Sequence, residues 1–309
     1  MAISRRSLLA SAAAAPLLPL ATHAAAGGHA AVAPAPVARS FAVGEFTVTT
    51  LLAGSGTRGE PQGTFGMNVS AEEFAAVSAE NFISADSYVG SFTPVLVQTG
   101  SETILFDTGL PGDGVPNALA SVGLSPADIT HVVLTHMHPD HIGGMTNDAG
   151  EVYTNAAYIA GSTEYNFWNG LGAGNRIFDL MSAKVMPFAE RMTFLDDGGA
   201  VRSGITAMDA SGHTPGHMAY MIESGGDQLL ITADMANHHV WSLANPDWEV
   251  RFDADKAAAA ATRRRVLGML AADRIPMVGY HMPFPAAGYV EARGDGFHWV
   301  PVTYQMTPA

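Results

Sequence analysis

Cysteine is absent from the 309 residues of the chain. Its absence excludes disulfide bonds, zinc sites built from thiolates and catalysis by a cysteine nucleophile. A metal site in this protein would therefore have to use the imidazole nitrogens of histidine and the carboxylate oxygens of aspartate or glutamate. Both groups are ordinary ligands of divalent transition metals.

Basic residues are scarce as well. Lysine and arginine number 15 against 29 aspartates and glutamates, and the formal net charge is −14. A chain this acidic is a poor candidate for binding nucleic acid, which attracts basic surfaces. The basic run Arg263–Arg265 lies in an alanine-rich helical pattern, and we expect it to form a solvent-exposed face rather than a binding patch.

The N-terminal segment lacks an apolar run long enough for a membrane helix. Residues 1–26 carry Arg5 and Arg6 in S-R-R-S-L-L, then an apolar stretch interrupted by Pro16 and Pro19, then small residues. The stretch is shorter than the roughly 20 residues that span a bilayer. The pattern resembles a twin-arginine signal peptide, which predicts the export machinery as a partner, cleavage near Ala24 or Ala26, and a periplasmic or secreted protein. A retained membrane anchor is the alternative.

Residues 27–40 are rich in glycine, alanine and proline and are predicted to be a flexible linker. From residue 41 onward, apolar runs typical of strands alternate with helical patterns, which favours one α/β domain over residues 41–309. Ser70 and Glu73 form a capping-box pattern for a helix, and residues 253–273 predict a second helix with Asp253 or Asp255 as its cap. Residues 55–70 are glycine-rich and are expected to form a loop.

The densest group of metal-capable side chains is the stretch T-H-M-H-P-D-H-I-G-G at residues 135–144. It follows I-T-H-V-V-L, a β-branched run that predicts a buried strand. In extended backbone, residues two apart point the same way, so His136 and His138 are aimed at one point. Pro139 favours a turn, after which Asp140 and His141 can face a second point close by. The loop therefore predicts two adjacent metal positions.

Two metal ions need more ligands than one loop supplies, and the sequence offers three further sites at predicted strand ends. His213 stands in G-H-T-P-G-H, Asp234 ends L-L-I-T-A-D, and His281 ends P-M-V-G-Y-H. Functional residues of α/β proteins gather at such strand ends. Each position alone would more often be a turn or cap residue, but together with residues 136–141 they complete a ligand set.

The order of these motifs resembles the metallo-β-lactamase superfamily, over residues 41–309. The resemblance implies an α/β fold, a four-layer αβ/βα sandwich in a single domain, with the site at one edge between the sheets. It also implies two divalent metal ions, with zinc the expected metal. Three side chains would hold the first ion: His136, His138 and His213. Three others would hold the second ion: Asp140, His141 and His281. Asp234 would bridge the two ions, and Asp107, in I-L-F-D-T-G, matches a buried aspartate that supports the ligand loop.

Two such cations share a water molecule and lower its pKa toward neutrality, so a bridging hydroxide can attack an ester, lactone, amide or phosphoryl centre. On this mechanism Asp140 and Asp234 contribute to catalysis through the metals. Lactonases of the best-known kind carry a tyrosine three residues after the bridging aspartate. Here that position is Asn237, followed by His238 and His239, and we expect His238 or a water to take the tyrosine's role.

The C-terminal stretch H-M-P-F-P-A-A-G-Y-V-E-A-R-G-D-G-F-H-W-V-P-V-T-Y is similar to the end of methyl parathion hydrolase and its relatives, some of which open lactones. We therefore expect an exported hydrolase of small hydrophobic lactones or carboxylic esters, with phosphotriesters as a further substrate class. A substrate pocket is predicted from five aromatic residues: Phe65, Phe92, Phe167, Trp168 and Phe284. The alternatives are a β-lactamase-like amide hydrolase and a non-catalytic exported metal-binding protein. The resemblance also implies a homodimer.

Overall fold

The computed structural model describes residues 37–303 of the chain. Its helices are α1 (Ala71–Glu80), α2 (Gly114–Ala120), α3 (Pro139–Ile142), α4 (Ser162–Leu171), α5 (Arg176–Lys184) and α6 (Lys256–Asp273). In this part of the chain, no helix combines the length and the apolar composition needed to cross a membrane. The predicted signal segment and residues 27–36 of the predicted linker lie outside the described residues.

Two seven-stranded sheets form the centre of the domain. The strands of the first sheet, in spatial order, are β1 (Ala38–Val43), β2 (Phe46–Leu51), β5 (Val95–Gln98), β6 (Thr103–Phe106), β7 (His131–Leu134), β10 (Ala157–Gly161) and β11 (Met192–Leu195). Those of the second are β12 (Ala200–Arg202), β13 (Ile205–Asp209), β14 (Met218–Ser224), β15 (Asp227–Ala233), β16 (Met277–Gly279), β17 (Ala287–Arg293) and β18 (Gly296–Pro301). The strands β6, β7, β10 and β11 run parallel, as do β15 and β16.

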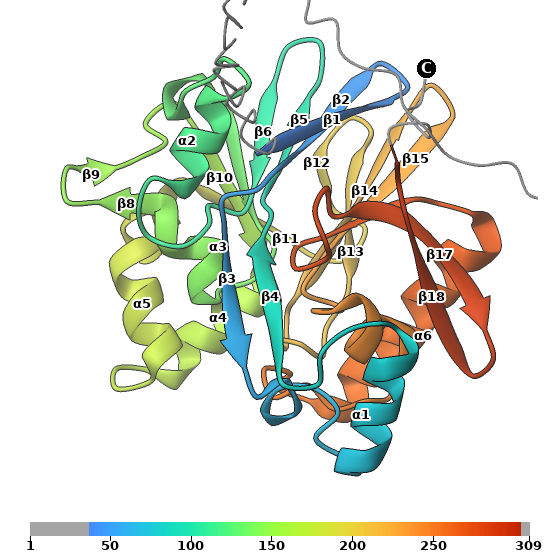
Figure 1. The fold of residues 1–309 in the computed structure, drawn as a ribbon. Coiled ribbons are helices and arrows are strands. Elements are labelled where there is room, and N and C mark those ends of the chain that lie inside the picture. The colour runs from blue at the N-terminus through green and yellow to red at the C-terminus, as the bar shows by residue number, and fades with distance from the viewer. Residues whose placement is uncertain (1–36, 304–309) are drawn as a thin grey trace, which may run out of the picture. The chain divides into compact units, whose positions relative to one another are not determined.

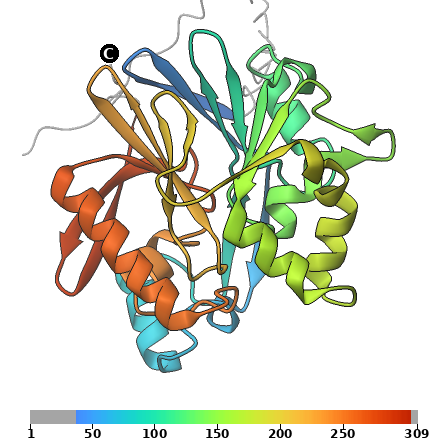
Figure 2. The same cartoon turned by 180° about the vertical axis from the view of Figure 1, so that it is seen from behind.

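The two sheets face each other, and the helices cover their outer sides. Figure 1 shows α2, α4 and α5 on the side of the first sheet, and Figure 2 shows α6, in orange, on the far side of the second. One core cluster joins the sheets, with Phe106 and Val133 from the first and Tyr220 and Ile231 from the second. The predicted αβ/βα sandwich is therefore confirmed.

The sequence patterns explain this layering. All four residues of β7 are buried, because the strand is covered on both faces, and such strands read as continuous apolar runs. Helix α6 packs against β17 and buries Val266, Leu267 and Leu270 completely. Burying each of these side chains contributes roughly 1.5–3 kcal/mol, which is enough to hold an exposed alanine-rich helix on the sheet.

Two predicted boundaries differ from the structure. Strand β1 begins at Ala38, inside the stretch predicted as linker, because Ala38 to Ser40 pair with residues 49–51 of β2. The predicted loop over residues 55–70 contains β3 (Gly54–Gly59), which forms a two-stranded ribbon with β4 (Ser87–Phe92). Glycine disfavours strands in isolation, and here the cross-strand hydrogen bonds outweigh that preference.

The helix caps follow the predicted chemistry. The Ser70 side chain accepts a hydrogen bond from the Glu73 amide at the start of α1. At α6 the N-cap is Asp255, whose side chain accepts a hydrogen bond from the Ala258 amide. The other candidate, Asp253, does not cap the helix. The remaining two strands, β8 (Thr146–Asn147) and β9 (Gly150–Glu151), pair with each other in a short antiparallel ribbon.

The expectation for Arg263–Arg265 is wrong at its first residue. Arg264 and Arg265 lie at the surface and pair with Asp247 and Asp209. Arg263 is fully buried, and its guanidinium donates to Asp253 at 2.7 Å. A buried arginine is stable only with a partner, and the sequence does not show that partner because it belongs to the loop before the helix.

Candidate metal centre

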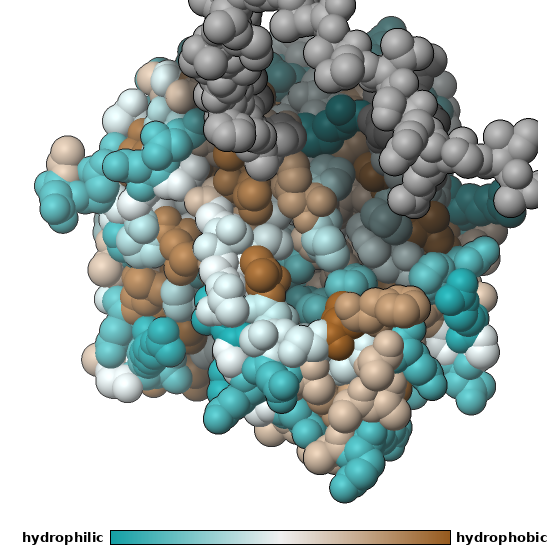
Figure 3. Space-filling view, viewed as in Figure 1, coloured by the Kyte–Doolittle hydropathy of each residue, from teal (hydrophilic) through white to brown (hydrophobic). Residues whose placement is uncertain are grey.

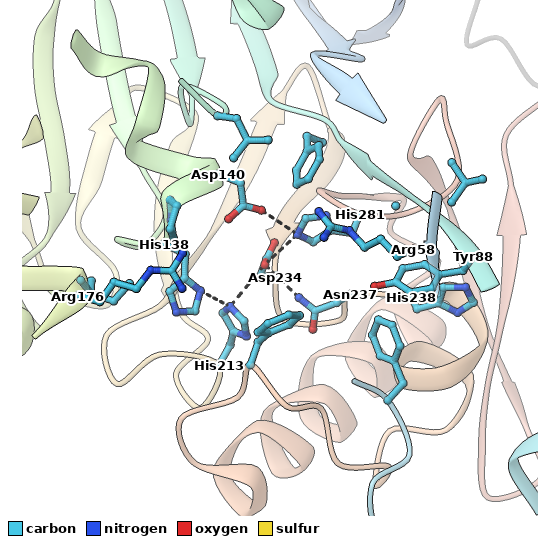
Figure 4. Close-up of a pocket in the computed structure, with 18 residues that line it drawn as sticks. Arg58, Tyr88, His138, Asp140, Arg176, His213, Asp234, Asn237, His238 and His281 are labelled. Atoms are coloured by element: carbon cyan, nitrogen blue, oxygen red, sulfur yellow. Dashed lines mark hydrogen bonds and ion pairs between the residues drawn. The ribbon is translucent and has the colours of Figure 1, made fainter. Parts of the chain in front are cut away.

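The predicted ligands meet where strands of both sheets end. His136, His138, Asp140 and His141 follow β7, and His213 lies between β13 and β14. Asp234 directly follows β15, and His281 follows β16. Figure 4 shows five of these side chains converging on one space: His138, Asp140, His213, Asp234 and His281.

His136, His138 and His213 form the first cluster. Nδ1 of His138 lies 3.1 Å from Nε2 of His136 and 3.0 Å from Nε2 of His213. Imidazole nitrogens bound to one tetrahedral zinc ion, at about 2.0–2.1 Å from it, lie roughly 3.3 Å apart. The three nitrogens therefore already have the spacing of a single metal ion's ligands.

The second cluster consists of Asp140, His141, Asp234 and His281. Nε2 of His281 lies 3.3 Å from Oδ2 of Asp140 and 3.1 Å from Oδ2 of Asp234. Nε2 of His141 lies 3.3 Å from Oδ1 of Asp234. Neutral imidazole and carboxylate together are a donor set suited to a divalent cation.

Asp234 is a member of the second cluster and also faces the first. Its Oδ1 faces His141, and its Oδ2 lies 3.4 Å from Nε2 of His213 in the first cluster. The carboxylate is almost fully buried. One carboxylate between two groups of imidazoles is the arrangement that a bridging ligand requires.

The polar atoms of the centre fit bound cations. Nε2 of His141 and Oδ1 of Asp234 are buried and have no hydrogen-bond partner among the described residues, and buried polar atoms are rarely left without one. Burial lowers the pKa of His281, but the carboxylates of Asp234 and Asp140 outweigh burial and raise it to about 10. The site therefore attracts positive charge, and two divalent metal ions would supply it.

Asp107 fixes the orientation of His141. The His141 ring donates from Nδ1 to Asp107 Oδ2 at 2.7 Å, which leaves its Nε2 facing the cluster. The same carboxylate accepts from the amide and hydroxyl of Thr135, at 2.9 and 2.8 Å. Asp107 thus supports the ligand loop from behind, in the place that its resemblance implies, and partners of this kind set the ring's tautomer.

Asp253 does the same for His213. Its Oδ1 accepts from Nδ1 of His213 at 3.0 Å, while its Oδ2 accepts from Arg263. The arginine also donates to the carbonyl of Pro246 at 2.7 Å. The buried arginine thereby neutralises the carboxylate that orients a metal ligand. Arg263, the first residue of the basic run, therefore stabilises the metal centre.

A second buried acid, Glu164 of α4, joins two ligand loops. Its Oε1 accepts from the Met137 amide at 2.9 Å, between the ligands His136 and His138. Its Oε2 accepts from the Thr214 hydroxyl at 2.7 Å and the Gly216 amide at 3.0 Å, just after His213. Sequence reasoning missed Glu164, because no local motif marks a lone glutamate in a helix.

Two further residues were also missed. His217, the second histidine of G-H-T-P-G-H, accepts from the Asp234 amide through Nε2 at 3.1 Å and so positions the shared carboxylate. Tyr280 lies against the His141 ring at 4.1 Å between centroids and donates to the Asp140 carbonyl. The motif itself could have pointed to His217. Nothing in the sequence marks Tyr280 except that it precedes a ligand.

A cavity of about 320 Å³ opens over the centre. Two of the five predicted aromatic residues, Phe65 and Phe92, line it, and so do Tyr88, Leu110 and Phe252, which the prediction did not include. On the face shown in Figure 3, apolar side chains lie over the β3–β4 ribbon and near α1.

The other three predicted pocket residues do not line this cavity. Trp168 packs in the core beside the first sheet and donates its indole N–H to Glu164 at 2.7 Å. Phe167 is the preceding residue of α4, and its side chain is partly exposed at the surface. Phe284 lies beyond the strand that delivers His281 and is absent from the lining. Hydrophobicity alone did not separate core and surface positions from pocket positions.

His238 lines the cavity with a defined tautomer. Its Nδ1 accepts from the amides of Val240 and Trp241, both at 3.2 Å, so the proton of the neutral ring is on Nε2. Burial lowers the pKa of His238 well below its ordinary value, which keeps the ring neutral. Asn237, in turn, donates to Asp234 Oδ2 at 3.0 Å.

Comparison with known proteins agrees with this geometry. The sequence profile of the Metallo-beta-lactamase superfamily matches residues 93–277, more than half of the chain. An N-acyl homoserine lactonase of Bacillus thuringiensis is 27% identical over 165 residues, which make up 45% of this chain and 61% of the lactonase. An atrochrysone carboxyl ACP thioesterase of a Cryptosporiopsis species is 29% identical over 149 residues, 47% of this chain and 38% of the thioesterase.

Solved structures match over more of the chain. AidC, a dizinc quorum-quenching lactonase, superposes with a TM-score of 0.80 at 26% identity, over 87% of this chain and 99% of its own. The hydrolase AbOPH superposes with a TM-score of 0.77 at 21% identity, over 87% and 99%, and shows the shared fold.

Proposed function

Because the chain belongs to the metallo-β-lactamase superfamily, we propose that it is a hydrolase that holds two divalent metal ions and cleaves small lactones or carboxylic esters. The observation that carries this proposal is the pair of ligand clusters that share Asp234. Zinc is the metal we propose, since nitrogen and carboxylate ligands suit it.

The ligand roles in this proposal follow the two clusters. The first ion would be held by His136, His138 and His213. The second would be held by Asp140, His141 and His281, with Asp234 shared between the ions. When bound, the ions would activate water and polarise the electrophilic oxygen of the substrate.

The chain's own residues would bind and orient the substrate. Phe65, Phe92 and Phe252 give the cavity apolar walls against which an acyl or alkyl group can pack. His238 would donate from Nε2 to an oxygen of the substrate, because its Nδ1 is already occupied. It would thus perform, from a different position, the hydrogen bonding that the tyrosine of other lactonases performs.

Two similarities support lactones and esters over other substrates. Several of the relatives are named as N-acyl homoserine lactonases, and AidC is a lactonase of the same fold. A further relative is named as a thioesterase. Phosphotriester hydrolysis is proposed only as a secondary activity of the same centre, because a bound phosphoryl group needs the same two cations.

A substitution of the shared ligand tests the proposal. The Asp234→Ala variant should lose one metal ion or both, measured as metal content per chain, and its kcat/KM for an acyl-homoserine lactone should fall at least about a thousandfold. The wild-type protein should hydrolyse this lactone faster than a methyl phosphotriester in the same buffer. A variant that kept its metal and its turnover would show that Asp234 is not a ligand.

We also propose export by the twin-arginine route and assembly as a homodimer, both of which rest on the sequence alone. Fractionation of cells that express the full chain, with and without an Arg5→Lys and Arg6→Lys double substitution, tests the first. Sedimentation of the purified protein tests the second.

A further inference from the structure

We propose that the preferred substrate carries a negatively charged group, a carboxylate in its simplest form, which Arg58 and Arg176 bind at the mouth of the cavity. This inference rests on the proposed function, because it names the class of ester or lactone that the same centre would cleave.

Two features together single out Arg58 and Arg176. Six arginines form ion pairs with carboxylates: Arg191, Arg202, Arg263, Arg264, Arg265 and Arg293. Within residues 37–303, Arg58, Arg176, Arg251 and Arg274 have no carboxylate within ion-pair distance, although acids outnumber bases by about two to one. Of these four, Arg58 and Arg176 line the cavity over the metal centre.

Arg58 is held on the cavity side of the β3–β4 ribbon. It pairs across the strands with Tyr88, and its guanidinium carbon lies 5.8 Å from the ring centroid of Phe92. Gly90 lies beside it, since a Cβ there would be 3.4 Å from Nε of Arg58. The exposed arginine is thus flanked by Tyr88, Gly90 and Phe92, and the Phe92 ring is 5.6 Å from the ring of the ligand His281.

Arg176 approaches from the opposite wall. Figure 4 shows it on the His138 side of the centre and Arg58 on the His281 side. It is the first residue of α5, where a positive charge is unfavourable because the helix dipole is positive at that end. Its side chain is exposed and lines the cavity, so it is available to a ligand there.

The cavity becomes positively charged once metal is present. In the described part of the chain, the acidic residues that line it are Asp140 and Asp234, and both belong to the ligand clusters. Two divalent cations would outweigh these two carboxylates, and the arginines add to the excess. A concave site lined by positive charge raises the local concentration of anions.

Tyr88 adds a neutral hydrogen-bond donor to the Arg58 wall. Burial raises the pKa of its phenol, while the charges of Arg58 and Arg251 partly oppose that rise. The hydroxyl is therefore protonated at neutral pH, and Figure 4 shows it directed into the cavity. A guanidinium and a phenol on one wall can together bind the oxygens of a carboxylate.

The test compares two para-nitrophenyl esters of equal chain length on the metal-loaded protein: the glutarate monoester, which ends in a carboxylate, and the neutral pentanoate. We expect kcat/KM to be about tenfold higher for the glutarate monoester, mainly through KM, and we expect this preference to decrease with added salt. A second pair of esters, one ending in a phosphonate and the other in a methyl group, gives the preference for a phosphonate. Comparing it with the preference for the glutarate monoester shows whether a phosphonate or a carboxylate fits better.

The variants separate the role of the arginines from the charge of the whole protein. Arg58→Gln and Arg176→Gln should each reduce the preference about threefold, and the double variant should remove it. Gly90→Val, which keeps the charge but places side-chain atoms against Nε of Arg58, should reduce it as well. Arg274→Gln is the matched control, because Arg274 ends α6 and lines a different cavity.

A wild-type preference for the neutral ester, or an equal preference in the double variant and the wild type, would overturn the inference while leaving the proposed function intact. If the protein cleaves neither these esters nor the acyl-homoserine lactone, the proposed function fails, and glutarate binding decides the inference independently of turnover. Calorimetry on the metal-loaded wild type should then show binding that the double variant weakens and Arg274→Gln does not.

Discussion

At the scale of single residues, the centre depends on atoms whose hydrogen bonds are already fixed. His141 donates to Asp107, His213 to Asp253 and His281 to the carbonyl of Ser91, each from Nδ1. Each bond leaves Nε2 directed at the centre, where it can bind a metal ion once it has lost any proton it carries. The site is thus preorganised, and a ligand ring need not rotate when an ion binds.

His238 gives a prediction at this scale. Asparagine at position 238 can still accept the Val240 and Trp241 amides but cannot reach into the cavity, whereas glutamine can place an N–H near the former Nε2. We expect kcat to fall about tenfold for His238→Asn, the value of one hydrogen bond, and less for His238→Gln. Steady-state kinetics on metal-loaded protein would measure both.

The pH profile checks the same assignment. Since burial lowers the pKa of His238 well below its ordinary value, the ring stays neutral as pH falls through about 6.5. The profiles of kcat/KM for the wild type and His238→Gln should therefore have the same shape in this range. An inflection near that pH, present only in the wild type, would show that His238 titrates and is not a fixed donor.

The ligands were predictable from the sequence, and their supporting residues were not. His136, His138, Asp140 and His141 occupy one short motif after a recognisable strand. Their partners are distant: Glu164 follows Met137 by 27 residues and precedes Thr214 by 50. Such pairs form only when two separate loops are packed together, and spacing along the chain does not reveal that packing.

At the scale of secondary-structure elements, helix α4 acts as a support between the two sheets. Glu164 binds the loop after β7 and the loop before β14, so it fixes the distance between His136 and His213. Trp168, one turn later, donates to the same carboxylate and keeps it in place.

Replacing Glu164 with glutamine tests this support. The amide has one acceptor oxygen and would turn an N–H toward groups that are themselves donors. We expect unfolding by urea to show a loss of about 3 kcal/mol, typical of a broken buried network. Metal affinity of the first cluster should fall about tenfold or more. Glu151→Gln, which changes a partly exposed acid that pairs with Arg191, is a suitable control.

The elements that form the cavity wall were the hardest to foresee. Strand β3 contains Gly54, Gly56 and Gly59, a composition that predicts a loop. Its pairing with β4 makes it a strand, and the ribbon then carries Arg58 and Tyr88 to the cavity. The main sheets were predictable because burial gives them apolar runs, whereas an exposed ribbon has no such signal.

At the scale of the whole molecule, metal binding and folding are coupled, because the ligands come together only in the folded domain. For one site at a free metal concentration a thousand times Kd, binding stabilises the fold by about 4 kcal/mol, which corresponds to a rise in Tm of roughly 10 °C. Removing the metal with a chelator should lower the Tm of the wild type by the same amount. The Tm of Asp234→Ala should change little when metal is added or removed. An unchanged Tm for the chelated wild type would contradict the assignment of the metal ligands.

The ligands also follow an order in time, because the ribosome releases the chain from its N-terminus. The loop after β7 emerges early, His213 follows after the first sheet is complete, and Asp234 and His281 appear only with the second sheet. A nascent chain that has not reached β16 thus has three histidines for one ion and an incomplete set for the other. Full metal loading therefore marks a chain whose synthesis has passed His281 and whose two sheets have docked.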